Sequence, residues 1–394
     1  MNTQAGIGVS HHRNPRMAAQ EAVKQALSQG AMDRPDFVFM FATVGYDQPT
    51  IVQAVHEAAG GAPLSGCSGE GIIVEDQPDE SNFAVAVMAL CSDEIRFEHG
   101  IAAGLKTDSI GVGRAIGLSI RPRLSSEARA LFLFPDGLTI NFDALSAGLE
   151  AELKLDRLLP LVGGTAGDNW QFKQTYQYCD DEVVSDGVAW ALLSGPVQIA
   201  SAVNHGCVAI GVEHKVTRSK ENTIFEIDGK PSLQVLNEYL TEEEMADWGK
   251  ALVNLPLGFE APKDMNGYDQ YLIRAMLARD ETIGSVTIPT EVSAGTSIWM
   301  TRRDYEKVVA GVDRLARQIK EQIGNQPAKL IFQFECAGRG KAFLRDQLKL
   351  QLLRHLQEQL PAAPWFGFYS FGEIGPVEAR NCFHNYTAVL AVLY

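Results

Sequence analysis

The chain has 394 residues, of which 46% are hydrophobic and 21% charged, and its formal net charge is −15. This length favours two domains, and the acidic balance, without any Lys/Arg-rich run, argues against a nucleic-acid or anionic lipid surface. The longest apolar runs are strand-sized and the N-terminus lacks the apolar core of a secretory signal, so we expect a cytoplasmic protein without a membrane span.

Three stretches of the chain repeat one order of elements. Each begins with a continuous apolar strand of the kind covered on both faces of a sheet, followed by a helix, a short strand with a glycine-rich turn, and a second apolar strand. The strand–turn segments are "PDFVFMFATVG" (35–45), "RALFLFPDG" (129–137) and "AKLIFQFECAGRG" (328–340), and the expected helices span 48–59, 141–153 and 343–360. The repetition predicts an α/β protein of mixed β-sheets flanked by helices.

Each repeat carries a turn in which glycine precedes an acidic residue. These turns are Gly69-Glu70, Gly167-Asp168 and Gly372-Glu373, and we expect them at equivalent places in the three repeats. Ends of buried strands are where α/β folds build pockets. The carboxylates could therefore contact a polar ligand, or they could accept backbone hydrogen bonds within their own turns.

A different region separates the second and third repeats. It begins with "TIFEIDGKPSLQVLNEYL" (223–240), a strand, an Asp-Gly turn and a helix, and Thr241 with Glu244 forms an expected capping box. Antiparallel strands then precede a long amphipathic helix whose apolar stripe starts at Val308. A boundary near residues 212–220 divides the chain into two packed domains, 1–215 and 216–394.

Arg339 lies between glycines in "CAGRG" (336–340). A guanidinium presented at a strand end suits a carboxylate or phosphate ligand. The alternative is an ion pair with Glu335 or Glu373.

Other chemistry has weaker support in the sequence. The glycines around Ser68 do not fall in the Gly-x-Ser-x-Gly register of a hydrolase elbow, and the six cysteines form no Cys-x-x-Cys pair. Cys67 and Cys336 lie in glycine-rich turns and are the cysteines to test for reactivity. No set of His, Asp or Glu residues has metal-ligand spacing, so no metal site is expected.

Three histidines are candidate axial ligands for a haem. We expect His355 on the apolar face of the 343–360 helix, between Leu352 and Leu356, whereas His205 and His384 flank strands near polar turns. The alternative for each is a satisfied structural histidine.

The motifs together resemble the FIST family of sensory proteins, which have an N-terminal and a C-terminal FIST module. The stretches that carry the resemblance are "GCSGEG" (66–71), "LFPDGL" (133–138), "VGGTAGD" (162–168), "HGCVAIG" (205–211), "VTRSKENTIFEIDGKPSLQVL" (216–236), "CAGRG", "FGEIGP" (371–376) and "FHNYT" (383–387). The resemblance implies an α/β sensor that binds a small ligand, with amino acids as proposed ligands, and signals to a partner. Some stand-alone members bind haem, sense nitric oxide and regulate histidine kinases.

The leading hypothesis is a non-enzymatic cytoplasmic sensor of an amino-acid-like ligand. Arg339 would receive an anionic group, Glu373 and Glu70 an amine, and His384 with Asn385 would orient the ligand beside the turn at Gly372. The partner would be a histidine kinase or another signalling protein. The alternatives are a sensor that binds haem b through His355, His205 or His384, an enzyme with Cys67, Cys336 or Ser68 as nucleophile, and a protein–protein scaffold.

Overall fold

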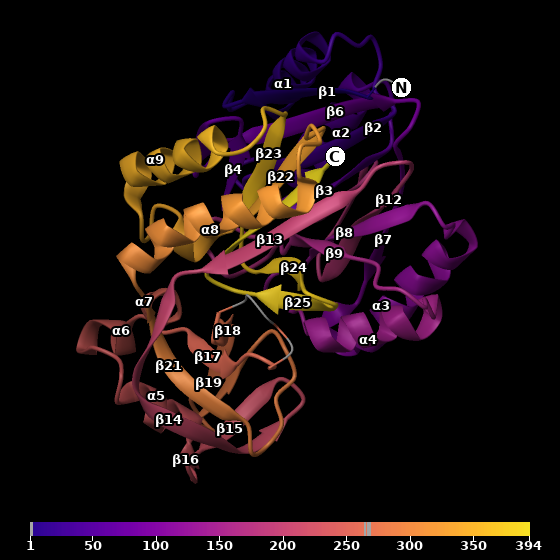
Figure 1. Ribbon diagram of the computed structural model, residues 1–394. Coiled ribbons are helices and arrows are strands. Elements are labelled where there is room, and N and C mark those ends of the chain that lie inside the picture. Colours follow the sequence, from indigo (N-terminus) through magenta and orange to yellow (C-terminus); the bar gives the residue numbers. More distant parts are fainter. Residues whose placement is uncertain (1–2, 264, 266–268) are drawn as a thin grey trace.

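The computed structural model describes residues 3–263, 265 and 269–394, which form mixed sheets flanked by helices (Figure 1). Most of the chain forms three units with the same order of elements. In each unit, a strand and a helix precede the repeat that the sequence shows. The first unit consists of β1 (Thr3–Ser10), α1 (Pro15–Gln29), β2 (Phe37–Ala42), α2 (Gln48–Ala58), β3 (Leu64–Ser68), β4 (Gly71–Val74), β5 (Gln77–Asp79) and β6 (Val85–Ser92).

The second and third units follow the same order. The second consists of β7 (Arg96–Ala103), α3 (Leu105–Ile120), a 3-10 turn (Arg121–Arg123), β8 (Ala128–Pro135), α4 (Phe142–Leu153), β9 (Leu161–Gly164), β10 (Gln177–Cys179), β11 (Glu182–Val184) and β12 (Gly187–Ser194). The third consists of β13 (Ile199–His205), α8 (Tyr305–Ile323), β22 (Leu330–Cys336), a 3-10 turn (Ala337–Arg339), α9 (Arg345–Glu358), β23 (Trp365–Ser370), β24 (Glu373–Val377), β25 (Arg380–His384) and β26 (Thr387–Leu393).

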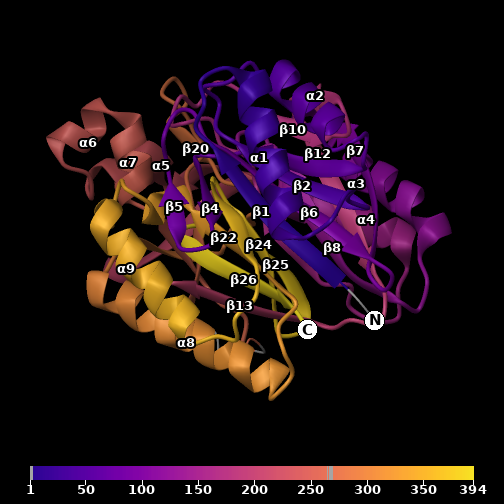
Figure 2. The ribbon, with the colours of Figure 1, turned by 90° about the horizontal axis from the view of Figure 1, so that it is seen from above.

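Each unit builds a sheet around its second strand. In the first unit β2 runs parallel to β3 and antiparallel to β6, which pairs with β1 at the edge. The second unit repeats this with β8, β9, β12 and β7, and the third with β22, β23, β26 and β13. The units' helices lie on the outside as three pairs, α1 with α2, α3 with α4, and α8 with α9 (Figure 2).

The hairpin of each unit completes the sheet of another unit. The β4–β5 hairpin of the first unit pairs with β23 of the third, the β24–β25 hairpin of the third with β9 of the second, and the β10–β11 hairpin of the second with β3 of the first. The exchange therefore closes on itself, and every unit both gives and receives a hairpin.

Aromatic side chains from the three central strands meet in the middle of the molecule. The ring centroids of Phe39, Phe132 and Phe332 lie 5.5, 5.2 and 4.9 Å apart in their three pairings. These residues occupy equivalent positions in β2, β8 and β22. The buried cluster around them contains residues from all three units, the first being Ile7 and the last Leu393. One shared core thus joins all three units.

Close strand packing confirms which residues are equivalent. A Cβ added at Gly66, Gly163 or Gly367 would lie 1.8, 2.0 or 1.8 Å from a carbonyl oxygen of the neighbouring parallel strand. Glu70, Asp168 and Glu373 follow these glycines by four, five and six residues. The three acidic turns thus lie at equivalent places, between the short parallel strand and the hairpin of each unit. The acidic residues themselves are offset because the turns differ in length, and they have different surroundings.

The region between β13 and α8 forms a separate antiparallel sheet with short helices and a core of its own. Its elements are β14 (Cys207–Lys220), β15 (Thr223–Ile227), β16 (Lys230–Pro231), α5 (Ser232–Asn237), α6 (Glu242–Ala246), α7 (Trp248–Asn254), β17 (Leu257–Glu260), β18 (Tyr271–Arg274), β19 (Ala278–Asp280), β20 (Ser285–Thr287) and β21 (Ser297–Arg303). We call residues 206–304 the inserted region. The capping box of Thr241 and Glu244 is present at the start of α6, and the boundary near residue 215 stays a prediction.

Candidate functional site

The inserted region meets the end of the three-unit body at which the acidic turns lie. β13 leaves this body at His205, which pairs with Thr387 close to the carboxyl end of β22. Asn385 joins the two parts: its Nδ2 donates to the Phe371 carbonyl (2.9 Å) and its Oδ1 accepts from the Ala275 amide (2.9 Å). The strand ends are therefore covered by the inserted region (Figure 1).

Arg339 is buried at this junction, with 3% of its surface exposed. Its Nε donates to Glu335 Oε1 over 2.6 Å, and Glu335 Oε2 accepts from the side-chain Nε2 of Gln333 (2.8 Å). The ion pair that the sequence offered as the alternative is thus present. Arg339 Nη1, however, has no hydrogen-bond partner within the described part of the chain, and a buried donor without a partner costs free energy.

The glycines beside Arg339 permit the close packing of this turn. A Cβ at Gly338 would lie 2.9 Å from the Tyr386 ring, and one at Gly340 would lie 2.6 Å from the Glu80 carboxylate. A cavity of about 30 Å³ borders Arg339, Glu335 and Lys349, which is room for one or two water molecules.

Glu373 is fully buried near this ion pair. Its Oε1 accepts from the Ser370 hydroxyl (2.6 Å) and its Oε2 from the Thr387 amide (3.3 Å). Burial raises the pKa of Glu373 well above its usual range, and the charge of Glu335 adds to this while Arg339 opposes it. This direction favours the protonated carboxyl group, which can donate as well as accept a hydrogen bond. Gly372 holds the turn: its carbonyl accepts from the Thr165 amide (2.7 Å).

His384 lies opposite Glu373 in the β24–β25 pair, and its Nε2 is 3.0 Å from the Gly375 carbonyl. Burial lowers the pKa of His384 to about 3, so the ring is neutral. His384 therefore stabilises the β24–β25 hairpin, whereas Asn385 connects the inserted region to the three-unit body.

Glu70 belongs to different surroundings. Its Oε1 accepts from the backbone amides of Asp168 (2.9 Å) and Trp170 (3.0 Å), whereas its buried Oε2 has no hydrogen-bond partner in the described structure. Burial raises the pKa of Glu70 to about 8. Glu70 therefore binds the turn at residues 168–174. Arg339, Glu335 and Glu373 form a separate electrostatic cluster.

Asp168 accepts hydrogen bonds from four backbone amides of its own turn, at 2.6–3.1 Å. It thus plays the structural part that the sequence left open. The turn that it organises places Asn169, Trp170 and Phe172 at positive φ (55°, 58° and 52°), and Phe172 stacks on Phe371 (5.3 Å between centroids).

The histidines offered as haem ligands do not fit that role. The expectation that His355 lies on an apolar face is wrong: it is exposed, and its Nε2 contacts Asp313 (2.8 Å) on α8. The buried face of α9 contains Lys349, Leu353 and Leu356, because Lys349 turns inward to Glu80 (2.6 Å).

His205 is buried, and burial lowers its pKa to about 4. Its Nδ1 accepts from the Cys207 amide (3.0 Å), and its Nε2 lies 3.6 Å from Asp269 Oδ1. With His384 held in its hairpin, these positions give no support to haem or nitric oxide chemistry.

The nucleophile candidates are engaged or buried. Ser68 donates its hydroxyl to the Gly167 carbonyl (2.7 Å) and accepts from the Tyr176 amide (3.0 Å). Burial raises the pKa values of the Cys67 and Cys336 thiols well above their usual range. Cys67 lies in the shared core, whereas Cys336 lies at the junction, where backbone hydrogen bonds from Gly338 and Tyr386 partly offset the rise in its pKa.

Arg303 is a residue of this junction that the sequence analysis missed. Its Nη2 donates to Asn254 Oδ1 (3.1 Å), its Nη1 donates to the Gly338 carbonyl, and its guanidinium lies 4.4 Å from the centre of the Phe343 ring. Its position at the end of a strand, in "MTRRD", is the available signal, but the partner loop lies more than thirty residues away in sequence.

Comparison with known proteins places both halves of the chain in one family. The FIST N domain model matches residues 36–230 and the FIST C domain model matches residues 232–376. An uncharacterized protein of Mycobacterium bovis is 27% identical over 98% of both chains, and an uncharacterized protein of Mycobacterium tuberculosis is 25% identical over 98% of both.

Among solved structures, the cyanuric acid hydrolase of A. caulinodans aligns with 100% of this chain and 99% of its own, with a TM-score of 0.40 and 8% identity. A chorismatase aligns over 100% and 99%, with a TM-score of 0.33 and 9% identity. None of the helices in the described ranges is both long and apolar enough for a bilayer crossing.

Proposed function

The chain belongs to the FIST family of sensory domains, and on this premise we propose that it is a non-enzymatic cytoplasmic sensor of a small amino-acid-like ligand. The ligand's anionic group would bind Arg339, and its amine would bind the carboxyl group of Glu373. A histidine kinase or another signalling protein would receive the signal.

The observation that carries the proposal is the buried guanidinium of Arg339 with its Nη1 unpartnered in the described structure. Glu335 occupies only the Nε side of the fork. A carboxylate at Nη1 would satisfy the orphaned donor and form a charge-assisted hydrogen bond, which is roughly twice as strong as a neutral one. An amine or hydroxyl group of the same ligand would form a hydrogen bond with the carboxyl group of Glu373.

Entry of such a ligand would require movement at the junction. The cavity of about 30 Å³ beside Arg339 is smaller than an amino acid, so binding would displace the turn at residues 337–344. Arg303 of the inserted region holds that turn through the Gly338 carbonyl. Binding would therefore change how the inserted region contacts the three-unit body, and this change would be read by the partner.

A thermal-shift screen of amino acids and small carboxylic acids, followed by calorimetry, tests the proposal. Arg339→Ala would leave Glu335 buried and unpaired, a loss of about 3–5 kcal/mol in the free energy of unfolding. The matched variant is therefore the double change Arg339→Gln with Glu335→Gln, which removes both charges. Arg129→Ala is the control, because Arg129 is half-buried at the amino end of β8 and donates to the Gly195 carbonyl.

We expect the ligand-induced shift to persist in the control and to vanish in the double variant. If no acid stabilises the protein, or the double variant keeps the full shift, the assignment of Arg339 fails.

The enzyme alternative depends on Cys336, the candidate nucleophile that lies at the junction. Its raised pKa leaves it a thiol at physiological pH, and a thiol needs a base to become a nucleophile. Labelling of Cys336 by an electrophilic probe in the folded protein, lost in Cys336→Ser, would favour this alternative.

A further inference from the structure

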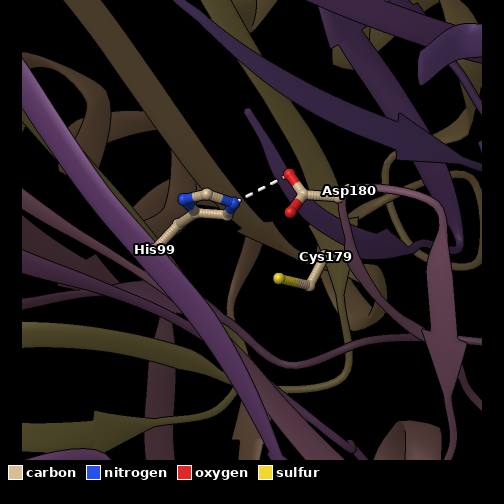
Figure 3. Close-up of side chains that lie close together, drawn as sticks. All are labelled: His99, Cys179 and Asp180. Atoms are coloured by element: carbon tan, nitrogen blue, oxygen red, sulfur yellow. Dashed lines mark hydrogen bonds and ion pairs between the residues drawn. The ribbon is translucent and has the colours of Figure 1, made fainter. Parts of the chain in front are cut away.

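A second group of reactive side chains lies away from the junction, at a seam between two sheets. His99 is on β7, whereas Cys179 ends β10 and Asp180 follows it in the hairpin turn. One ligand atom from each of the three residues lies within 4.8 Å of the other two, and His99 Nε2 is 2.8 Å from Asp180 Oδ1 (Figure 3). The hairpin exchange creates this group, because β10 pairs with β3 of the first unit while β7 pairs with β12 of the second.

The donor set matches a transition-metal site. An imidazole nitrogen, a thiolate and a carboxylate oxygen are the ligands of zinc, at about 2.0–2.3 Å from the ion. With these bond lengths, the ligand atoms of a tetrahedral site lie about 3.4 Å apart. Side-chain movements of about 1 Å would bring the three ligand atoms to these separations. Three protein ligands leave the fourth position for water.

The surroundings hold two of the ligands in place. Asp180 has a positive φ of 55°, and its backbone amide donates to the Leu64 carbonyl (3.0 Å) while its Oδ1 accepts from the Leu64 amide (3.0 Å). The His99 ring stands edge-on to Phe37, with centroids 5.7 Å apart. A ligating carboxylate that also accepts a hydrogen bond is typical of metal sites, and the packing on Phe37 limits the rotation of the His99 ring.

The charge at this seam also favours a cation. The carboxylates of Asp180, Asp181 and Glu182 lie near the Cys179 thiol. The same charges attract a divalent ion, which would displace the thiol proton. His99 and Cys179 are only partly buried, so an ion in solution can reach them.

We propose that His99, Cys179 and Asp180 form a site for a single Zn²⁺ ion that joins the β7 edge to the exchanged β10–β11 hairpin. The ion releases one proton from the Cys179 thiol to solvent on binding, and no redox step takes place.

Zinc and cobalt titrations of the full chain, freed of metal by a chelator, test the site. Competition with a chromogenic chelator should give one Zn²⁺ per chain, and Co²⁺ should produce a thiolate-to-cobalt charge-transfer band in the near ultraviolet. Cys179→Ser should abolish that band and weaken zinc binding by about 100-fold, and His99→Ala should weaken it similarly. The thermal midpoint should rise with Zn²⁺ in the native chain but not in either variant.

Cys91→Ser is the control, because Cys91 is the other partly exposed cysteine that lies near an aspartate, Asp36. It should leave stoichiometry, band and midpoint unchanged. Circular dichroism of the metal-free variants checks that Cys179→Ser and His99→Ala are folded. Absence of a charge-transfer band in the native chain, or zinc binding that survives both substitutions, would overturn the proposal.

Discussion

Replacing Glu70 by glutamine should remove a large pH dependence from the stability of the protein. The pKa of Glu70 is about 8 in the folded chain, against 4.5 for an unperturbed glutamate. Between these values the folded carboxyl keeps its proton while the unfolded one loses it, so unfolding releases a proton and becomes easier as pH rises. The free energy of unfolding therefore falls by about 1.4 kcal/mol per pH unit, or about 5 kcal/mol over the whole interval.

Glu70→Gln keeps an oxygen that can accept from the Asp168 and Trp170 amides and has no proton to lose. Its stability relative to the native chain should be nearly unchanged at about pH 5, higher by about 3 kcal/mol at about pH 7, and higher still at about pH 8. Urea unfolding followed by tryptophan fluorescence at these pH values measures the difference. Glu358→Gln, at an exposed position of α9, should show no such trend. Parallel pH profiles for Glu70→Gln and the native chain would refute the reasoning.

Two further predictions test the architecture. Gly66→Ala and Gly367→Ala should each cost about 3 kcal/mol or more by chemical denaturation, because the new Cβ would lie 1.8 Å from a backbone oxygen. Gly60→Ala, which enters open space at a φ of 70°, should cost only about 1–2 kcal/mol, and equal losses at the three sites would contradict the packing argument. Asn385→Ala should loosen the inserted region, since it removes the hydrogen bonds of the Asn385 side chain to the Phe371 carbonyl and the Ala275 amide. Hydrogen exchange at the Ala275 amide should accelerate, and unchanged exchange would assign the docking to other contacts.

The sequence allowed the repeated units to be predicted because each one contains its own local signals. Runs such as "FVFMF" and "LIFQF" show a buried strand, and the helix of 141–153 was placed within one residue of α4. Which strands receive the hairpins could not be predicted. A hairpin's alternation of apolar residues is the same whether it pairs within its unit or with strand β23, nearly three hundred residues away.

The candidate site shows the same limit. The glycines around Arg339 indicate a presented guanidinium, and the sequence leaves its pairing with Glu335 open as an alternative. The error at His355 has a specific cause: a lysine in a helix is normally counted as outward-facing, but Lys349 is buried against Glu80 of the first unit. This long-range ion pair rotates the buried face of α9 away from His355. His99 and Cys179 are eighty residues apart, so no local spacing could have joined them.

The closed exchange of hairpins has a consequence for synthesis on the ribosome. The β4–β5 hairpin is made early, but its pairing strand β23 ends at Ser370, about 300 residues later. At translation rates of about 5–20 residues per second, that hairpin waits roughly 15–60 s for its partner. The phenylalanines of the first central strand remain without their third neighbour over the same period. The nascent chain therefore carries an open sheet edge and a half-built aromatic core until it is nearly complete, which is when we expect it to need a chaperone most.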